Sequence, residues 1–252
     1  MANNTSGQPD PEPKQTRWDR FLYWSRRFHE SPVFDENERD YKLVVASRLQ
    51  GARSSLFNDD PLWFDELHHA ITAKPNNLTN WRATRAFETW CRAEPETAKL
   101  ALRLLWNEDT AVAKRFDQFA EVVATSGQNV LIAEASFFHM AVDPHAFPMF
   151  RATPVDRAMA LTNYAQLKEV GIKPDELGRR YEHFLWFLDV MIKRAANGGL
   201  HLRDRLDAQS AAWVVTQWSP LDDWSEADKQ AFLAYQGEAA LRKDSWGEPK
   251  KP

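Results

Sequence analysis

The sequence predicts an all-α protein, an irregular bundle of about ten or eleven helices. Apolar residues recur at intervals of three and four along most of the chain, which is the period of a helix face. No alternation of apolar and polar residues extends beyond about four positions. Clusters of proline, glycine and asparagine interrupt the periodic stretches, so short helices are expected, with Val122-Val123 and Val214-Val215 as the stretches where a strand is the alternative.

The first helix is expected from its aromatic residues at positions 18–28, and further helices follow from Leu43 and Leu49, from Phe87 and Trp90, and from Leu100 with its following leucines. Helix starts are expected at Thr79, at Thr153 with Pro154 in the first helical position, at residues 173–176 with acids in the first turn, and at Ser225. Breaks are expected at residues 31–32, 59–61, 74–77, 107–109, 126–127, 143–144, 170–171, 197–199 and 219–220.

Composition fits a folded protein with a large core. The 252 residues are 43% hydrophobic and include eleven Trp, fifteen Phe and five Tyr. The single cysteine, Cys91, excludes an intramolecular disulfide and a cysteine-rich zinc site, and it fits a reducing compartment. The formal charge of −4 argues against a surface that grips nucleic acid over its whole area, although a local basic patch is compatible with it.

The domain organisation expected is a disordered tail over residues 1–15, a helical domain over 16–242 and a tail or linker over 243–252. Two helical subdomains, with a break near residues 126–130, are an open alternative. No apolar stretch approaches the roughly 20 residues that a membrane-spanning helix needs, and the N-terminus lacks the order of a secretory signal. A cytoplasmic protein without membrane contact is expected.

No motif for catalysis is recognisable. The nine glycines form neither a phosphate-binding loop nor a dinucleotide-binding turn, and no Gly-x-Ser-x-Gly elbow is present. His68-His69 is a vicinal pair whose rings diverge on a helix, so no metal site is expected. His139 and His145 flank a helix end, as a polar pair at a turn or as part of an enzyme cleft. We therefore expect no enzyme, no catalytic residue and no cofactor.

Basic residues are the candidate binding groups for nucleic acid or another anion. One set interleaves with aromatic residues of the first helix, and a second set flanks Gly198-Gly199. The alternative for the first helix is a buried aromatic stripe with arginines on the solvent side. The candidates are Arg17, Arg20, Arg27, Lys193, Arg194, His201, Arg203 and Arg205.

Two segments carry a family resemblance: AEASFFHMAVDPHAFPMFRATP (residues 133–154) and DRLDAQSAAW (residues 204–213). They resemble the helical N-terminal region that precedes the ATPase in McrB-like AAA+ restriction proteins, and the stretch from Trp81 to Trp106 is compatible with it. The likeness covers most of residues 20–220. It implies a module that recognises double-stranded DNA or docks a partner. A separate AAA+ motor or nuclease subunit would act in trans, because this chain carries no motor.

The same two segments predict an internal lock between helices. Asp143-Pro144 ends a helix, and an extended stretch follows in which Phe147, Met149 and Phe150 fill a groove. Arg151 is expected to pair with Asp204 or Asp207. The predicted structural lock comprises Asp143, Phe147, Phe150, Arg151, Asp204, Asp207, Gln209 and Trp213.

Three functions remain open from the sequence. The first is a non-enzymatic recognition or scaffold module of a prokaryotic restriction or anti-phage defence system. The second is a protein-interaction adaptor without nucleic-acid contact. The third is a helical enzyme with a cleft near His139 and His145.

Overall fold

The computed structural model describes residues 16–79, 81–128 and 131–239. Within these residues the chain forms eleven α-helices and one π-helical turn without any strand, so the prediction of an all-α bundle is confirmed. The two valine pairs where a strand was the alternative lie inside helices. The elements are α1 (Arg17–His29), η1 (Glu36–Asp40), α2 (Tyr41–Phe57), α3 (Trp63–Thr72), α4 (Trp81–Ala93), α5 (Pro95–Leu105), α6 (Val112–Thr125), α7 (Ile132–His139), α8 (Ala152–Thr162), α9 (Leu177–Asn197), α10 (Arg205–Gln217) and α11 (Glu226–Glu238).

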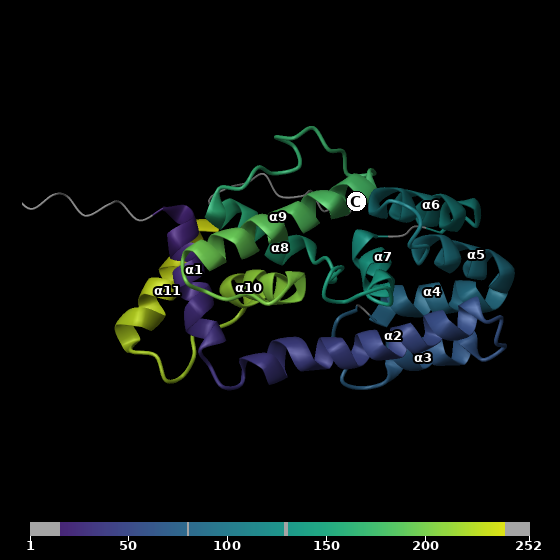
Figure 1. The fold of residues 1–252 in the computed structure, drawn as a ribbon, viewed down its shortest axis with the longest axis horizontal. Helices are drawn as coiled ribbons and strands as arrows, with labels where there is room; N and C mark the ends of the chain where they lie inside the picture. Colours follow the sequence, from purple (N-terminus) through teal and green to yellow (C-terminus); the bar gives the residue numbers. More distant parts are fainter. Residues whose placement is uncertain (1–15, 80, 129–130, 240–252) are drawn as a thin grey trace, which may run out of the picture.

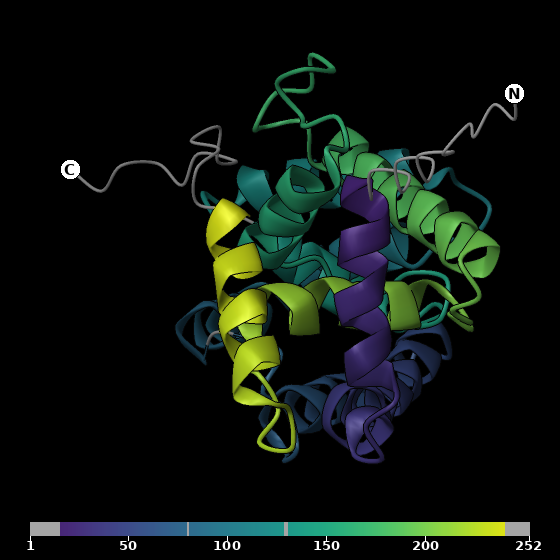
Figure 2. The same cartoon turned by 90° about the vertical axis from the view of Figure 1, so that its left-hand side faces the viewer.

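Helix α10 lies at the centre of one half of the molecule. It packs against α1, α8, α9 and η1, and almost every residue from Leu206 to Thr216 is buried. Figure 2 shows α10 crossing behind α1 and α11, which run side by side. A helix that is buried on all sides needs small residues where its neighbours approach closely. In α10 these small residues are Ala208, Ala211 and Ala212, which are all buried.

Paired helices build the other half. Helix α2 packs along α3, and α5 packs along α6, with α9 reaching from the α10 half to contact α6 (Figure 1). The start of α9 approaches α6 so closely that a Cβ on Gly178 would lie 2.1 Å from the carbonyl oxygen of Ala113. The Gly178 N–H also donates to the Asp117 carboxylate at 2.9 Å. Only glycine fits this contact between the two helices.

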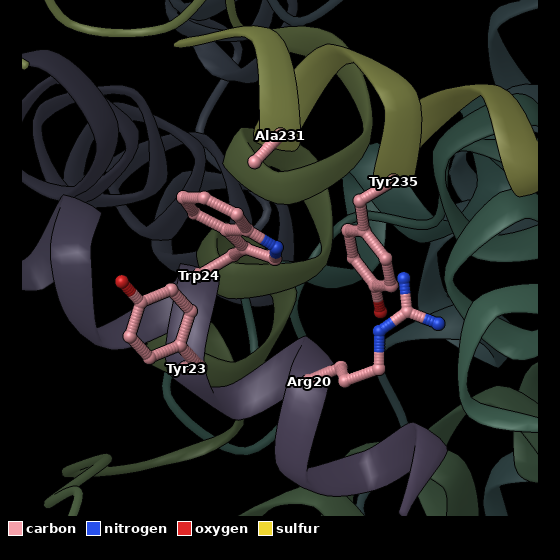
Figure 3. Close-up of a pocket in the computed structure, with 5 residues that line it drawn as sticks. All are labelled: Arg20, Tyr23, Trp24, Ala231 and Tyr235. Atoms are coloured by element: carbon pink, nitrogen blue, oxygen red, sulfur yellow. The ribbon is translucent and has the colours of Figure 1, made fainter. Parts of the chain in front are cut away.

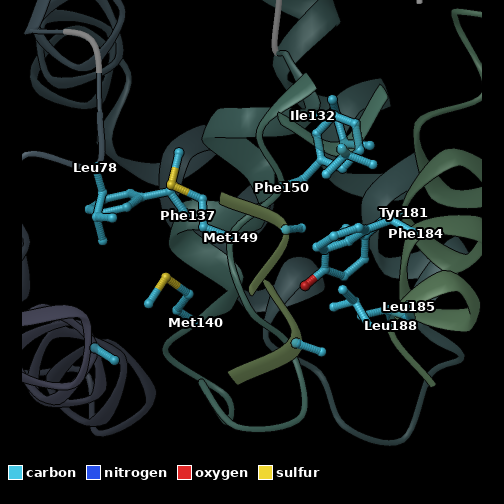
Figure 4. Close-up of a cluster of buried hydrophobic side chains, with 14 of the residues drawn as sticks. Leu78, Ile132, Phe137, Met140, Met149, Phe150, Tyr181, Phe184, Leu185 and Leu188 are labelled. Atoms are coloured by element: carbon cyan, nitrogen blue, oxygen red, sulfur yellow. The ribbon is translucent and has the colours of Figure 1, made fainter. Parts of the chain in front are cut away.

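One hydrophobic cluster joins both halves, with members from Trp18 to Ala239. Figure 4 shows the part where α7 and the segment after it meet α9. There the Phe150 ring contacts Phe184 edge-on at 5.3 Å between centroids, and the Tyr181 hydroxyl donates to the backbone carbonyl of Pro148 at 2.9 Å. The predicted subdomain break near 126–130 lies between α6 and α7, and the described part of the cluster is continuous across it. The predicted tails 1–15 and 243–252 lie outside the described residues.

The first helix has the predicted two-sided character. Its buried residues are Trp18, Phe21, Leu22, Trp24, Ser25 and Phe28. Thr16 closes a capping box with Asp19, which satisfies the first backbone N–H groups of the helix.

Three other predicted helix starts can be judged. Ser225 caps α11 as predicted. The prediction for α8 is wrong because Arg151 is the extended N-cap and Pro154 is the third helical residue, a position that needs no intrahelical donor. The acids at 175–176 precede α9 rather than beginning it, because the Glu176 carboxylate accepts the Lys173 N–H at 2.6 Å and closes a turn first. Helix α4 begins at Trp81, and residue 80 lies outside the described residues.

Among the helices that the structure describes, none combines the length and apolar character needed to cross a membrane. Cys91 is buried in α4, and burial raises the pKa of its thiol to about 12.

Candidate functional site

The two segments that carry the family resemblance meet at the start of α10. Asp204 is the N-cap of this helix and accepts the backbone N–H of Asp207 at 3.0 Å. The same carboxylate accepts two hydrogen bonds from Arg39, at 2.9 and 2.5 Å. It also lies 2.7 Å from Nδ1 of His145, which belongs to the first segment. Arg39 therefore links α10 to η1, and His145 links α10 to the loop after α7.

A second arginine completes what we call the α10 network: Asp35, Arg39, His145, Arg203, Asp204 and Asp207. Arg203 contacts Asp207 at 2.7 Å and Asp35 at 2.5 Å. Asp207 is 1% exposed and Arg39 7%, so these charges are largely removed from water. Burial opposes ionisation of Asp204, but hydrogen bonds from Arg39, the Asp207 backbone and His145 outweigh it and lower its pKa to about 2.

The predicted pairing of Arg151 with Asp204 or Asp207 is wrong. Arg151 donates to the backbone carbonyl of Leu78, and its guanidinium lies 5.3 Å from the centre of the Trp213 ring. Instead, Arg39 donates hydrogen bonds to the carboxylates of both Asp204 and Asp207. Arg151 is the N-cap of α8, and its long side chain extends to the loop before α4. It therefore links Leu78 to α10 through a cation–π contact with the Trp213 ring and not through an ion pair.

A buried polar group lies beside the α10 network. The Lys42 ammonium contacts Glu38 at 3.1 Å, Gln209 at 2.9 Å and Ser210 at 2.9 Å. Burial lowers the pKa of Lys42 and raises that of Glu38, whereas each charge opposes the shift of the other. Gln209, a predicted member of the structural lock, thus bonds to α2.

The other lock residues stabilise the segment after α7. The Asp143 carboxylate accepts the His145 N–H at 2.8 Å, and the Phe150 N–H donates to the Ser136 hydroxyl at 2.9 Å. The Phe147 ring packs on His139, with 4.7 Å between centroids. The extended stretch predicted after Pro144 is shorter than expected, because residues 144–147 form a turn in which the Phe147 N–H donates to the Asp143 carbonyl at 2.8 Å, and only residues 148–151 are free of turns.

His139 and His145 do not share a cleft. His139 is completely buried, 3.3 Å from a nitrogen of Arg115 and enclosed by aromatic rings, and burial lowers its pKa to about 3. His145 is exposed and bonds to Asp204 and Arg39. The cleft proposed for the enzyme alternative therefore cannot include the imidazole of His139.

Half of the predicted anion-binding residues are engaged in ion pairs. Arg20 pairs with Glu238 and Arg27 with Asp228, both across the α1–α11 contact. Arg205 pairs with Asp189 of α9, and Arg203 with Asp35 and Asp207. Phosphate binding at any of these arginines would first have to displace an internal carboxylate.

Of the remaining predicted cations, Arg17 lies in the first turn of α1, and Lys193 and Arg194 lie in the last turns of α9. The Arg194 guanidinium lies 5.2 Å from the centre of the Trp18 ring, and Arg17 donates to the backbone carbonyl of Ala160 at 3.4 Å. Arg26, in the last turn of α1, donates to the carbonyl of Gly198 at 2.5 Å and so supports the turn after α9. We call Arg17, Arg26, Lys193 and Arg194 the α1–α9 basic surface.

No carboxylate of the described residues lies within 4 Å of a charged nitrogen of the α1–α9 basic surface. Asp19 is nearby, but its carboxylate accepts the Thr16 hydroxyl and N–H. These hydrogen bonds lower the pKa of Asp19, and the charge of Arg194 adds a smaller contribution. His201 lies apart, in a pocket of about 290 Å³ that Arg203 and His29 also line.

Sequence reasoning missed two sets of residues. Arg39 lies in the run Asp-Glu-Asn-Glu-Arg-Asp, which looks like a solvated helix face, and nothing in that run indicates its burial. Helix α4 exposes Arg82, Arg85 and Arg92. Their spacing of three and seven residues places them on one helix face, and this signal was present in the sequence.

The described residues hold no group of three or more histidine, cysteine or acidic side chains arranged to bind a metal ion. His68 bonds to Glu88 of α4 at 2.6 Å, whereas His69 lines a different pocket, of about 430 Å³, so the two rings diverge as expected.

Comparison with known proteins found no matching family model, no matching curated protein and no matching solved structure.

Proposed function

We propose that this chain is a non-enzymatic recognition module of a prokaryotic restriction or anti-phage defence system, and that it binds double-stranded DNA through the α1–α9 basic surface. The observation that carries the proposal is that four cations on α1 and at the end of α9 have no described carboxylate in contact, and that Arg194 and Arg26 connect the two elements. The resemblance of residues 133–154 and 204–213 to McrB-like proteins supplies the biological setting. An AAA+ motor or nuclease subunit would act in trans.

Charge and geometry support this choice of surface. Phosphate contacts supply most of the affinity of a protein for DNA, and they need cations that no internal acid has neutralised. Lys193 and Arg194 are exposed at the last turns of α9. Arg17 is exposed in the first turn of α1, so the three charges reach solvent from rigid elements.

Fluorescence anisotropy with labelled duplexes, plain and base-modified, tests the proposal. The full chain is titrated at low and at physiological salt. Lys193→Gln combined with Arg194→Gln should weaken binding to every duplex and reduce the slope of log affinity against log salt by about 2, because each neutralised cation no longer binds a phosphate. The matched control is Arg179→Gln, at the other end of α9, where the arginine already pairs with Glu176.

Two outcomes would contradict parts of the proposal. No binding by the full chain at low salt refutes direct DNA recognition. Binding that survives the Lys193/Arg194 double variant but disappears in Arg85→Gln with Arg92→Gln places the DNA on the exposed face of α4 instead.

Protein docking is the second candidate function, and one exposed residue favours it. Trp186, in the middle of α9, is 56% exposed, and exposed tryptophans are enriched at energetically important positions of interfaces. A chain that acts only as an adaptor gives no anisotropy change with any duplex, even at low salt, so the same titration separates the two functions.

A further inference from the structure

Trp186, in the middle of α9, differs from the other exposed aromatic side chains that the structure describes. Tyr23 is 42% exposed, Phe57 47% and Trp186 56%. The Tyr23 ring contacts Trp24 edge-on at 4.8 Å between centroids, in the groove between α1 and α11 (Figure 3). The Arg53 guanidinium lies 5.4 Å from the centre of the Phe57 ring. Within the described part of the chain no ring or guanidinium contacts Trp186 in this way, so its indole is available to a ligand.

The same face of α9 presents a cation two turns further on. Lys193 follows Trp186 by seven residues, so it lies at nearly the same angle around the helix and about 10 Å further along the helix axis. Val190 is half-buried between the two. Lys193 is exposed, and no carboxylate of the described residues lies within ion-pair distance of it. One face of a rigid helix therefore offers an indole and an ammonium group in line.

Two acids border this face, and they limit where a phosphate backbone can run. Asp189 accepts two hydrogen bonds from Arg205, at 2.7 Å each, so its charge is compensated. Glu182 lies one turn before Trp186, and no basic group of the described residues pairs with it. Phosphates are therefore attracted at Lys193 and repelled beyond Trp186. A strand that follows α9 from Lys193 is expected to end near Trp186.

Base stacking is the interaction that an exposed indole adds to phosphate contacts. Every nucleobase has a flat π face, and stacking on an aromatic side chain raises affinity by about tenfold per base. Within a duplex these faces are covered by the neighbouring base pairs, so only an unpaired base can stack on the indole. The rise of about 10 Å between Trp186 and Lys193 matches about three nucleotide steps of roughly 3.4 Å. The face therefore fits a short single strand and not a long one.

We infer that Trp186 stacks on an unpaired base in a single-stranded extension of about three nucleotides, at the end of a duplex whose phosphates contact Lys193. The inference rests on the proposed function, because it takes the α1–α9 basic surface as the site that holds the duplex. It goes further by naming the form of DNA that this surface prefers, which is a duplex end with a short extension.

Fluorescence anisotropy with the full chain tests the inference on three labelled ligands. They are a blunt duplex, the same duplex with a three-nucleotide adenine extension, and the same duplex with three abasic sites in place of the adenines. Extensions of both strand polarities are made. The adenine extension of at least one polarity should bind about tenfold more tightly than the blunt duplex. The abasic extension, which carries the same phosphates without bases, should gain at most about twofold.

Variants of Trp186 assign the gain to the indole. Trp186→Ala should remove the gain and leave the affinity for the blunt duplex unchanged, whereas Trp186→Phe should keep most of the gain because an aromatic face remains. The matched control is Tyr23→Ala, at the exposed aromatic residue between α1 and α11, and it should leave the gain unchanged. Unchanged melting temperatures verify that each variant is folded.

The blunt duplex keeps this inference separate from the proposed function. Equal affinity for the blunt and the extended duplex overturns the inference alone, and so does an equal gain from the abasic extension. A gain that persists in Trp186→Ala also overturns it and leaves protein docking as the role of this side chain. Absence of binding to every ligand at low salt refutes the inference together with direct DNA recognition.

Discussion

At the start of α10, Arg39 and Arg203 are held by Asp35, Asp204 and Asp207, whereas at the end of α9, Lys193 and Arg194 face solvent without a described carboxylate in contact. Lys193 and Arg203 are only ten residues apart in sequence and have similarly basic neighbours there. The difference shows that the partners of an arginine, and not its sequence neighbours, decide whether it stabilises the fold or offers charge to a ligand.

Breaking the α10 network should have the largest effect on stability. Arg39→Ala leaves the buried Asp207 without its closest cation from η1 and removes both hydrogen bonds to Asp204. We expect a loss of about 3–5 kcal/mol in the free energy of unfolding. Urea denaturation monitored by circular dichroism measures it. A loss comparable to that of an exposed arginine would show that Arg203 alone satisfies Asp207.

Arg151→Ala should cost less, because the side chain makes one hydrogen bond to a backbone carbonyl and one contact with the Trp213 ring. A loss of about 1–3 kcal/mol is expected, since the Leu78 carbonyl loses a buried donor. DNA affinity should be unchanged. Unchanged melting together with a loss of DNA or partner binding would instead place Arg151 in the functional surface.

Acid should weaken the fold through His139. Burial lowers its folded-state pKa to about 3, so its neutral form is favoured and its contribution is fully present above pH 6.5. As pH falls below 6.5, the unfolded chain binds a proton that the folded chain cannot, and one unit lower the cost is about 1.4 kcal/mol. Melting temperatures between pH 8 and 5 should fall less steeply in His139→Gln.

The smallest effect on stability is expected at the α1–α9 basic surface. Lys193→Gln with Arg194→Gln removes exposed charges that no described acid contacts, so the free energy of unfolding should change by no more than about 0.5 kcal/mol. Thermal melting of this double variant and of Arg39→Ala, measured side by side, compares the contribution of the two regions to stability. A large loss would mean that Arg194 stabilises the fold through the Trp18 ring, and the affinity test would then need Lys193→Gln alone.

The fold class was predictable because helix periodicity and breaks are local signals, as the buried stripe of α1 illustrates. The placement of the candidate site was only partly predictable. The cations Arg17, Lys193 and Arg194 were named from their neighbours, and the structure brings α1 and α9 together around Trp18. The pairing of Arg39 with Asp204 spans 165 positions, and no local pattern encodes a contact of that kind. A single sequence therefore predicted Arg151 as the partner, which is nearer in sequence and wrong.

The ion pair between Arg20 and Glu238 also brings the two ends of the described body close together. It joins the first turn of α1 to the last turn of α11 at 2.5 Å, so residues 16 and 239 lie at the same pole of the molecule (Figure 2). A short linker could close the body into a ring, and new ends could be opened in an exposed connection such as residues 107–111 with little loss of folding entropy. In such a circular permutant the order of the helices changes while the contact between α1 and α11 is kept.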